Sequence, residues 1–591
     1  MNEKKKMIKT VLSYPKLAER LEEKSLSNKA EAIKYLNEIA ADLSMSTMHM
    51  FKRFLDNTLS ALYDGVNLST PSDMDFKELV KTKNVVLVPN HQSHADYLAL
   101  NYIVFSNFKI PLYVAGGINL NIFPIGKLFR KSGCFFIRRS FSSNILYKLV
   151  LEGYLYYLLI EGLPIEFFFE GGRSRTGRLL PPKYGLYQML LEAHKCIPED
   201  VKRELIFVPT SIIHEYVPEQ KSLAKELKGG KKTKENSKEL LKLFKLISKQ
   251  FGNIHLSFGK PVTAHLTDDI KRDTQNLAFD CFREVGRQMK LTPTSLLCML
   301  LLDEPSGAIG WEKILDRGKQ IIDFCEKFNI PYSKSLTEAK FTESMERAID
   351  ILISNNKVNV IGRSSLGHLF YSIKHDSRME LLYFKNSIIH HFLVPWIINT
   401  AWINIFNGSI KTVADLKRLF LQERSQLKHE FYLPTVKEFL YLTLKVISDC
   451  IGREVNDLEE CVNLSHQELY QIATKLGVFS RCCSFILEGY YNTAITLKKI
   501  GEVNSFDYEA FQKLAKSTFE SELKIGRVIK HNESFSVPLL KSSMKYFEHQ
   551  GVVKNNQGQY EIIDFDILDS TIESFDKDLK FRHSFNIKGF I

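Results

Sequence analysis

The sequence predicts an α/β protein with a central mixed sheet flanked by helices, an N-terminal helical bundle and a mainly helical C-terminal domain. From Asn84 onward, short apolar runs alternate with helical patterns, which is typical of a sheet that carries helices on its faces. The residues before this region and after about Leu266 show helical spacing instead. Because 591 residues are too many for one compact core, we expect three domains, at 1–80, 81–290 and 291–591.

The N-terminal domain is expected to be helical from about Lys16 to Tyr63, with no strand pattern. Its apolar residues recur at the spacing of one helix face. They are Leu17, Leu21, Leu26, Ile33, Leu36 and Ile39, followed by Met50, Phe54, Leu59 and Leu62. The acidic, proline-containing stretch at 69–77 is interpreted as the linker to the sheet.

Six strands are expected in the sheet, with helices such as 94–105 and 144–161 between them. The strands are placed at 85–88, 112–115, 134–137, 165–169, 206–210 and 254–258. Ligands of such sheets gather beyond the carboxyl ends of the strands. His91, Arg138 and Glu170 each follow an expected strand, so we expect them to meet at one crevice.

The C-terminal domain is expected to be helical, with long periodic segments at 314–328 and 438–450. Its tail, at 535–563, predicts a helix and a short hairpin. No stretch has the length and apolarity of a convincing transmembrane helix. The nearest is 392–406, which is uncharged and contains Trp396 and Trp402. This segment is interpreted either as a buried helix or as an interfacial segment that seats the protein on a bilayer.

The charge of the chain favours anionic partners. There are 80 lysines and arginines against 68 acidic residues, which leaves a net charge of +12. Phosphorylated substrates, an acidic carrier or an anionic membrane surface would suit this excess. We expect no nucleic-acid partner, because no basic helix or nucleic-acid-binding motif is recognisable. The nine cysteines are scattered, which indicates a reducing environment.

The segment VVLVPNHQSHAD, residues 85–96, carries the strongest chemical signal. An apolar strand brings His91 to its end, and Asp96 follows where a helix should begin. An imidazole beside a carboxylate can act as a general base near neutral pH. Asp96 also fits a capping box with Ser93, and both roles can hold together. His91, His94 and Asp96 superficially suggest a metal site, but no further ligand motif accompanies them, so no metal is expected.

Two later strand ends carry arginines. FFIRRS contains Arg138 and Arg139, and FFFEGGRSRTGR contains the residues Glu170, Gly171, Gly172, Arg173, Ser174 and Arg175. Guanidinium groups offer planar, bidentate donors for a phosphate, and glycines allow the backbone to approach a ligand closely. The alternative is that these arginines form ion pairs at the edge of the sheet.

These three motifs, together with AGGINL at 115–120 and VPTSIIHEY at 208–216, resemble the H-x4-D glycerolipid acyltransferases. Within that family the bacterial membrane-associated glycerol-3-phosphate acyltransferases and their dihydroxyacetone-phosphate relatives are most similar. The resemblance implies transfer of a fatty acyl group from acyl-CoA or acyl carrier protein to the sn-1 hydroxyl of glycerol 3-phosphate. Dihydroxyacetone phosphate is the alternative acceptor, and a non-catalytic lipid- or carrier-binding protein is the alternative of another class.

The resemblance also assigns roles to residues. His91 would be the base and Asp96 its partner, and the glycerol phosphate would lie against Arg138, Glu170, Gly171, Arg173 and Ser174. Arg139, Gly172 and Arg175 are secondary candidates. No cofactor is expected besides the acyl donor.

The acyl donor is expected to contact Pro209, where the alternative is a proline that ends an edge strand. The segment 221–249 contains ten lysines and three glutamates, with Lys231 and Lys232 at its most exposed part. It is either a solvated surface or a contact for acyl carrier protein, coenzyme A phosphates or anionic lipid. We expect a peripheral protein on the cytoplasmic face of the inner membrane.

Overall fold

The computed structural model describes residues 3–22, 26–121, 125–138, 144–227, 251–304, 306–362, 369–431, 433–501, 505–530 and 532–587. The chain forms two compact units. Unit 1 comprises residues 1–174, 179–219 and 233–290, and unit 2 comprises 175–178, 220–232 and 291–591. The division near residue 290 coincides with the expected start of the C-terminal domain. No division between the units falls at residue 80, and the N-terminal helices belong to unit 1.

Unit 1 contains a mixed sheet in the order β1-β7-β6-β2-β5-β3-β4, with β8 paired to β6. Its strands are β1 (Gly65–Ser69), β2 (Asn84–Pro89), β3 (Tyr113–Gly117), β4 (Cys134–Ile137), β5 (Ile165–Glu166), β6 (Leu205–His214), β7 (Asn253–Phe258) and β8 (Val262–Thr263). β6 runs antiparallel to β7 and β8, and the other pairs are parallel. The predicted α/β class and its mixed sheet are confirmed.

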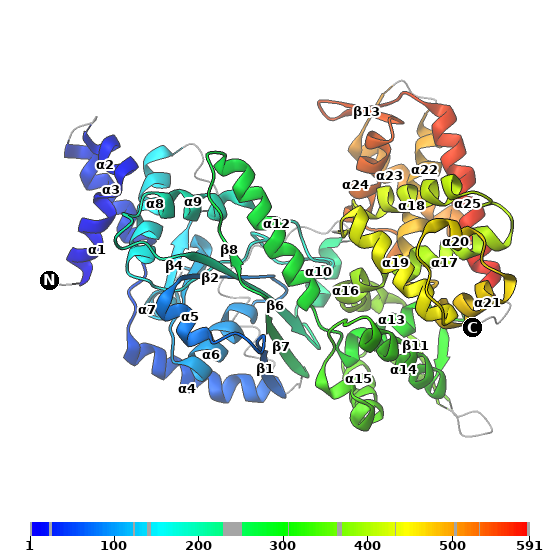
Figure 1. The fold of residues 1–591 in the computed structure, drawn as a ribbon, viewed down its shortest axis with the longest axis horizontal. Helices are drawn as coiled ribbons and strands as arrows, with labels where there is room; N and C mark the ends of the chain where they lie inside the picture. Colours follow the sequence, from blue (N-terminus) through cyan, green and yellow to red (C-terminus); the bar gives the residue numbers. More distant parts are fainter. Residues whose placement is uncertain are drawn as a thin grey trace. The chain divides into compact units, whose positions relative to one another are not determined.

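The two strands at the centre of the sheet explain where its core lies. Every residue of β2 and β6 is buried. A strand covered on both faces reads as a continuous apolar run, which is why the sequence predicted both. Figure 1 shows helices on both sides of the sheet, with α8 (Ile145–Ile160) and α9 (Tyr184–Lys195) on one side and α4 (Met45–Leu62) and α6 (Asp96–Phe108) on the other.

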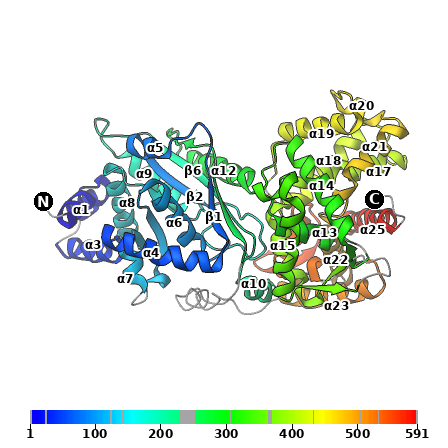
Figure 2. The ribbon, with the colours of Figure 1, turned by 90° about the horizontal axis from the view of Figure 1, so that it is seen from below.

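The remaining helices of unit 1 lie around this sheet. They are α1 (Glu3–Leu12), α2 (Pro15–Glu22), α3 (Leu26–Ile39), α5 (Phe76–Thr82), α7 (Ile125–Lys131) and α12 (Ile270–Gln288). The first three pack against α8, and Figure 2 shows α1 and α3 beside it. The expected helical region at the N-terminus is therefore present, packed on the sheet domain.

Unit 2 is mainly helical, as expected. Its helices are α10 (Gln220–Leu227), α13 (Pro293–Asp303), α14 (Trp311–Lys327), α15 (Phe341–Ser354), α16 (Arg378–Ile388), α17 (Leu393–Phe406), α18 (Val413–Leu427), α19 (Val436–Ile451), α20 (Leu458–Val462), α21 (His466–Leu476), α22 (Ser484–Ile500), α23 (Tyr508–Lys524), α24 (Val537–His549) and α25 (Phe565–Ile587). Two small sheets join β10 (Val358–Ile361), β11 (Phe370–Ile373) and β9 (Ala308–Gly310), and β12 (Phe506–Asp507), β14 (Gln559–Ile562) and β13 (Val553–Asn556). α24 and the β13–β14 pair confirm the predicted helix and hairpin.

The tryptophan segment is part of the core of unit 2. Trp396 is 2% exposed and Trp402 is 7% exposed, and the guanidinium of Arg582 lies 3.6 Å from the ring centre of Trp396. The segment His375–Phe406 is long and apolar enough to cross a membrane by length and composition, yet 78% of its apolar window is buried. A buried helix is therefore confirmed, and the interfacial interpretation of 392–406 is wrong, because unit 2 covers both indoles.

Candidate functional site

His91 and Asp96 form a hydrogen-bonded pair at the carboxyl end of β2. The Nδ1 of His91 lies 2.8 Å from the Oδ2 of Asp96. The same oxygen accepts hydrogen bonds from the backbone N–H groups of Gln92 at 2.6 Å and Ser93 at 2.9 Å. The carboxylate of Asp96 therefore closes the loop around the imidazole and also begins α6. This is half of the expected capping box, since the hydroxyl of Ser93 accepts from Ala95 rather than from Asp96.

A second histidine meets the same carboxylate. The Nε2 of His214, the last residue of β6, lies 2.6 Å from the Oδ1 of Asp96, and both side chains are fully buried. Burial alone would raise the pKa of Asp96, but hydrogen bonds from His214 and His91 hold it well below its usual range. Asp96 is therefore an anion, and sequence reasoning missed one of its two imidazole partners.

The ionised state of Asp96 fixes the tautomers of both imidazoles. A carboxylate only accepts hydrogen bonds, so Nδ1 of His91 and Nε2 of His214 must carry the hydrogens that they share with it. The Nε2 of His91 is then the nitrogen that can accept a proton. The His91 side chain is 14% exposed, so its ring is not sealed from solvent. Its ring stacks on Phe168, with ring centroids 4.2 Å apart.

Glu170 holds the loop that carries His91. One carboxyl oxygen accepts from the backbone N–H of His91 at 3.0 Å, and the other accepts from that of Leu180 at 2.8 Å. Burial raises the pKa of Glu170 to about 8, although these two bonds oppose the shift. The N–H of Ser174 donates to the carbonyl of His91 at 2.8 Å. The glycine-containing loop after β5 is thus bound to the His91 loop by two hydrogen bonds, one to the N–H and one to the carbonyl of His91.

The two glycines of this loop differ in their surroundings. Gly171 has a φ of +68°, in the left-handed region that favours glycine. A Cβ added there would lie 3.1 Å from the side chain of Lys183, whereas one added at Gly172 would meet nothing within 4 Å. Only Gly171 is therefore required by the conformation of the loop.

Arg173 is buried near Glu219. Its Nη1 lies 4.0 Å from the Oε1 of Glu219, which also accepts from the hydroxyl of Ser93 and the backbone N–H of His94, both at 3.0 Å. Glu219 therefore links the arginine of one motif to the helix start of another. Among the described residues no group of three or more His, Cys, Asp and Glu side chains could hold a metal ion.

Arg138 lies at the end of β4 and pairs with the N-terminal helices. Its Nε and Nη2 each lie 2.7 Å from a carboxyl oxygen of Glu38 on α3, and its guanidinium stacks on Tyr35 and Tyr147. Glu38 raises the pKa of Arg138. The structure therefore shows Arg138 in an ion pair, the alternative that the sequence had left open. Arg139, Lys231 and Lys232 lie outside the described residues.

Arg175 belongs to unit 2, unlike Arg173 and Ser174. Its Nε lies 3.2 Å from the carboxylate of Glu226 on α10. The next arginine, Arg178, is buried in unit 2 and forms an ion pair with Glu430. Burial lowers the pKa of Arg178 to about 10. The motif that the sequence presented as one loop is therefore divided between the two units.

Pro209 lies inside β6, opposite Val88 of β2. Its carbonyl accepts the N–H of Gly259 at 2.8 Å. Because β6 has neighbours on both sides, the alternative that Pro209 ends an edge strand is wrong. It is buried in the same strand as His214, five residues before that histidine.

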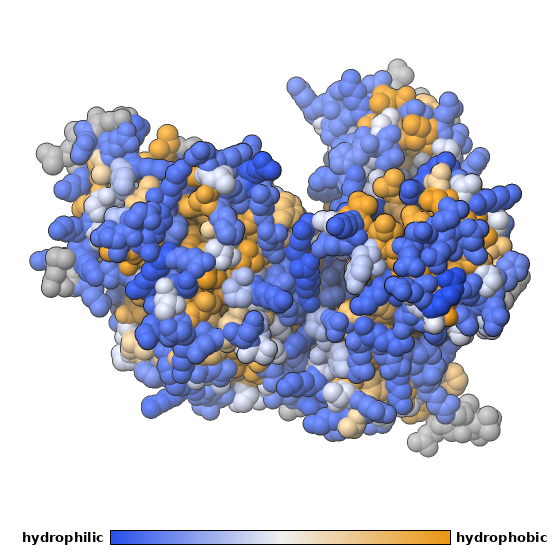
Figure 3. All heavy atoms as spheres, viewed as in Figure 1, coloured by the Kyte–Doolittle hydropathy of each residue, from blue (hydrophilic) through white to orange (hydrophobic). Residues whose placement is uncertain are grey.

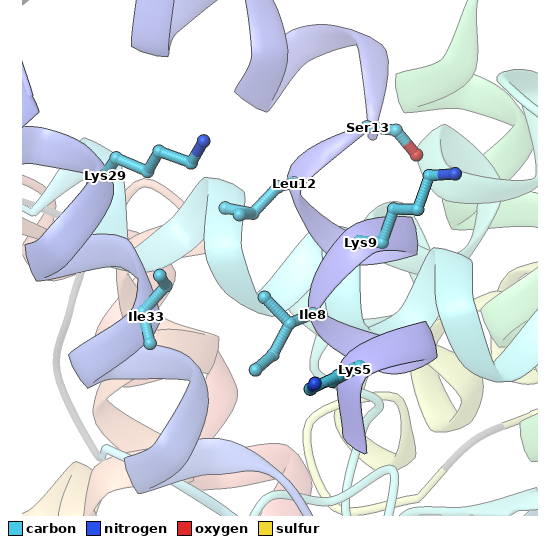
Figure 4. Close-up of a pocket in the computed structure, with 7 residues that line it drawn as sticks. All are labelled: Lys5, Ile8, Lys9, Leu12, Ser13, Lys29 and Ile33. Atoms are coloured by element: carbon cyan, nitrogen blue, oxygen red, sulfur yellow. The ribbon is translucent and has the colours of Figure 1, made fainter. Parts of the chain in front are cut away.

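A separate groove of about 510 Å³ lies between α1 and α3 (Figure 4). Lysines stand at its rim and apolar side chains form its floor. It is lined by Lys5, Ile8, Lys9, Leu12, Ser13, Lys29 and Ile33. None of the candidate site residues that the structure describes lines this groove.

Comparison with known proteins identifies two matching families. The family described as "Glycerol-3-phosphate acyltransferase C-terminal region" matches residues 223–556, which is more than half of the chain, and the family described as "Acyltransferase" matches residues 73–213. The second range contains His91, Asp96 and the motif after β5.

Two curated relatives are named glycerol-3-phosphate acyltransferase. The one from Pseudoalteromonas translucida is 31% identical over 482 residues, covering 78% of this chain and 57% of the relative. The one from Pasteurella multocida is 31% identical over 494 residues, covering 79% and 58%. The chain thus spans little more than half the length of these relatives. A solved 1-acyl-sn-glycerophosphate acyltransferase from Thermotoga maritima, matched over 41% of this chain and 78% of its own, is 16% identical, with a TM-score of 0.24.

Proposed function

The chain belongs to the glycerol-3-phosphate acyltransferase family, and from this premise we propose that it acylates the sn-1 hydroxyl of glycerol 3-phosphate. The acyl group comes from acyl-CoA or acyl carrier protein, and the product is lysophosphatidate. The observation that carries this proposal is the His91–Asp96 pair, in which the Nδ1 of His91 is 2.8 Å from a buried carboxylate.

The geometry of this pair supports general-base catalysis. The Nε2 of His91 takes the proton of the acceptor hydroxyl as that oxygen attacks the thioester carbonyl. The negative charge of Asp96 stabilises the imidazolium that forms. The tetrahedral intermediate then collapses, the carbon–sulfur bond breaks, and the leaving thiolate takes the proton from His91. One ester is formed for each thioester cleaved, and no cofactor besides the donor is needed.

The phosphate of the acceptor is proposed to lie against Arg173 and Ser174, which adjoin the His91 loop, with Arg138 as a further phosphate ligand. Glu170 and Gly171 fix the conformation of the loop 170–175, and Gly172 is proposed to leave room for the phosphate beside the backbone. The acyl donor is proposed to contact the wall around Pro209, and the phosphates of coenzyme A or the acidic carrier protein are proposed to meet Lys231 and Lys232.

The protein is proposed to act as a peripheral protein on the cytoplasmic face of the inner membrane. The net charge of +12 supports attraction to an anionic leaflet. On the face seen in Figure 3, hydrophilic side chains predominate and apolar ones form scattered patches. Attachment through charge fits this surface better than deep insertion.

One assay tests the reaction. The purified chain is given labelled acyl-CoA or acyl carrier protein with glycerol 3-phosphate, dihydroxyacetone phosphate or lysophosphatidate as acceptor, after dialysis against a chelator. We expect glycerol 3-phosphate to be acylated fastest. A clear preference for dihydroxyacetone phosphate would reassign the acceptor, and no transfer to any acceptor would favour a binding protein.

A further inference from the structure

His214, at the end of β6, lies where it can affect His91, the proposed base. His214 and His91 meet the two oxygens of one carboxylate, at 2.6 Å and 2.8 Å. The Oδ2 of Asp96 also accepts from two backbone N–H groups, whereas among the described residues His214 is the donor that meets Oδ1. Because Asp96 is fully buried, water does not replace a missing donor at Oδ1.

The positions of the two histidines are fixed relative to each other by the sheet. Asn90, which precedes His91, bonds β6 through both ends of its amide. Its Nδ2 donates to the carbonyl of Ile212 at 3.0 Å, and its Oδ1 accepts from the N–H of Ile212 at 2.6 Å. Asn90 is thus joined to Ile212 by two hydrogen bonds. His91 is the residue after Asn90, and His214 lies two residues after Ile212.

The two ring nitrogens of His214 have different surroundings. Its Nδ1 is buried and has no hydrogen-bond partner among the residues that the structure describes. Nε2 is therefore the ring nitrogen through which His214 makes its hydrogen bond. The ring of Tyr63 lies beside it, with centroids 6.1 Å apart.

We propose, on the basis of the proposed acyltransferase function, that His214 is a positioning residue for the reaction. It donates its Nε2 hydrogen to Oδ1 of Asp96 and holds the carboxylate so that Oδ2 faces His91. It touches no substrate. Its effect on turnover passes through Asp96 to the tautomer and orientation of His91.

The titratable groups around this pair constrain its pH dependence. Besides His91 and His214, several titratable groups interact with Asp96 or lie next to its loop. They are Tyr63 at the end of α4, Tyr97 on α6, Glu166 on β5, Glu170 after β5, and Glu219 with Arg173. Burial raises the pKa of Tyr63 and Tyr97, so both stay neutral near pH 7, and it also raises the pKa of Glu166. Without the hydrogen bond from His214, the pKa of the buried Asp96 rises.

Two substitutions at His214 distinguish hydrogen-bond donation to Asp96 from a role in packing alone. His214→Gln places an amide N–H the same number of bonds from the backbone as Nε2, whereas His214→Leu has no donor. His255→Leu is the matched control, because His255 is a buried histidine of the neighbouring strand β7 that pairs with Glu215 at 3.0 Å instead of Asp96.

In the acyl-transfer assay, we expect His214→Leu to lower kcat at least about tenfold, since a buried charged acceptor loses its donor. The KM for glycerol 3-phosphate should stay within about twofold of wild type. The deficit should grow as the pH falls, because Asp96 then takes up a proton. His214→Gln should recover most of the activity. If His214→Leu matches His255→Leu, or if His214→Gln is as impaired as His214→Leu, the proposal is overturned.

A second measurement does not depend on activity. Hydrogen exchange at the amides of Gln92 and Ser93, which donate to Asp96, should become about tenfold faster in His214→Leu. It should stay near wild type in His214→Gln and His255→Leu. If the wild-type protein transferred no acyl group, the proposed function would fail, and these exchange rates would still decide the role of His214. Unchanged exchange in His214→Leu would overturn that role.

Discussion

His91 is held at its ring and at its backbone, which is the arrangement that a base needs if it is to stay aligned through a proton transfer. Asp96 binds its Nδ1, Glu170 binds its N–H, and the N–H of Ser174 binds its carbonyl. Such positioning groups contribute by holding the reacting atoms in line before the chemical step.

The first prediction concerns the base itself. His91→Ala should reduce kcat/KM by roughly 10²- to 10⁴-fold, the loss typical when a general base is removed. Steady-state kinetics with glycerol 3-phosphate measures this loss, and circular dichroism checks the fold. His265→Ala, at an exposed histidine of the same unit, is the control and should keep its activity. A folded His91→Ala protein with normal turnover would rule out base catalysis by this residue.

The second prediction concerns Asp96 and pH. Because the folded-state pKa of Asp96 is depressed, its contribution to stability is present above the unfolded pKa of about 3.9 and is lost as the pH falls through the folded value. Asp96→Asn should therefore lower the melting temperature of unit 1 most clearly above about pH 5. The gap to wild type should narrow below about pH 4. Scanning calorimetry from pH 3 to 8 measures it, and a gap that widened toward low pH would contradict the assigned charge.

The sequence could predict the His91–Asp96 pair but not its third member. His91 and Asp96 lie five residues apart, so a strand end and a helix start bring them together locally. His214 reaches Asp96 only through the parallel pairing of β2 with β6 and the four residues by which β6 extends beyond that pairing. The spacing of residues within one strand does not determine which residues of a distant strand pair with it.

At the scale of elements, the strands with buried apolar residues were predictable, and two partly exposed strands were not. β4 was placed at its observed bounds, and β2 and β7 within one residue. β1 and β8 were missed, because β1 has no fully buried residue and β8 has only two residues, both partly exposed. β5 is shorter than expected, since the chain leaves the ladder after Phe167, whose N–H still donates to the carbonyl of Leu87, and then forms the loop of the site.

The third prediction tests whether Arg138 binds phosphate or only holds α3 against the end of β4. If Arg138 also binds phosphate, Arg138→Ala should raise the KM for glycerol 3-phosphate about tenfold or more, because a charge-assisted bond is lost. Glu38→Gln, which removes the partner of Arg138, should change this KM much less.

The measurement is acceptor saturation together with thermal melting for both variants. Arg453→Ala, which removes an exposed ion pair in unit 2, is the control and should leave the KM unchanged. Equal losses of melting temperature in Arg138→Ala and Glu38→Gln, with KM unchanged in both, would assign Arg138 to holding α3 against the sheet domain.

At the scale of the whole molecule, Trp396 and Trp402 are buried, so we expect membrane binding to depend on surface charge and not on these two side chains. Attachment should come from surface lysines, each worth about 1 kcal/mol near an anionic leaflet. The Debye length falls from about 10 Å at 0.1 M salt to about 3 Å at 1 M. Binding to anionic vesicles should therefore be largely lost at about 1 M salt.

Vesicle co-sedimentation measures this dependence, with zwitterionic vesicles as the control. Replacing Lys221 and Lys225, two exposed lysines of α10, with glutamine should weaken binding at low salt. Binding that persisted at 1 M salt would show that an apolar element of the chain inserts into the bilayer.

The assignment of Arg175–Arg178 to unit 2 has a consequence for the order in which the protein is made. Arg178 is buried against Glu430, and a side chain at Gly177 would collide with the carbonyl of Tyr383. When the ribosome has finished unit 1's sheet, these four residues still lack the surroundings that bury them. The 252 residues from 178 to 430 (430 − 178) take on the order of 10 to 50 s to synthesise at about 5–20 residues per second. Until Glu430 has been synthesised, the residues after Ser174 lack the contacts that bury them. The acyltransferase motif therefore reaches its final conformation only late in translation.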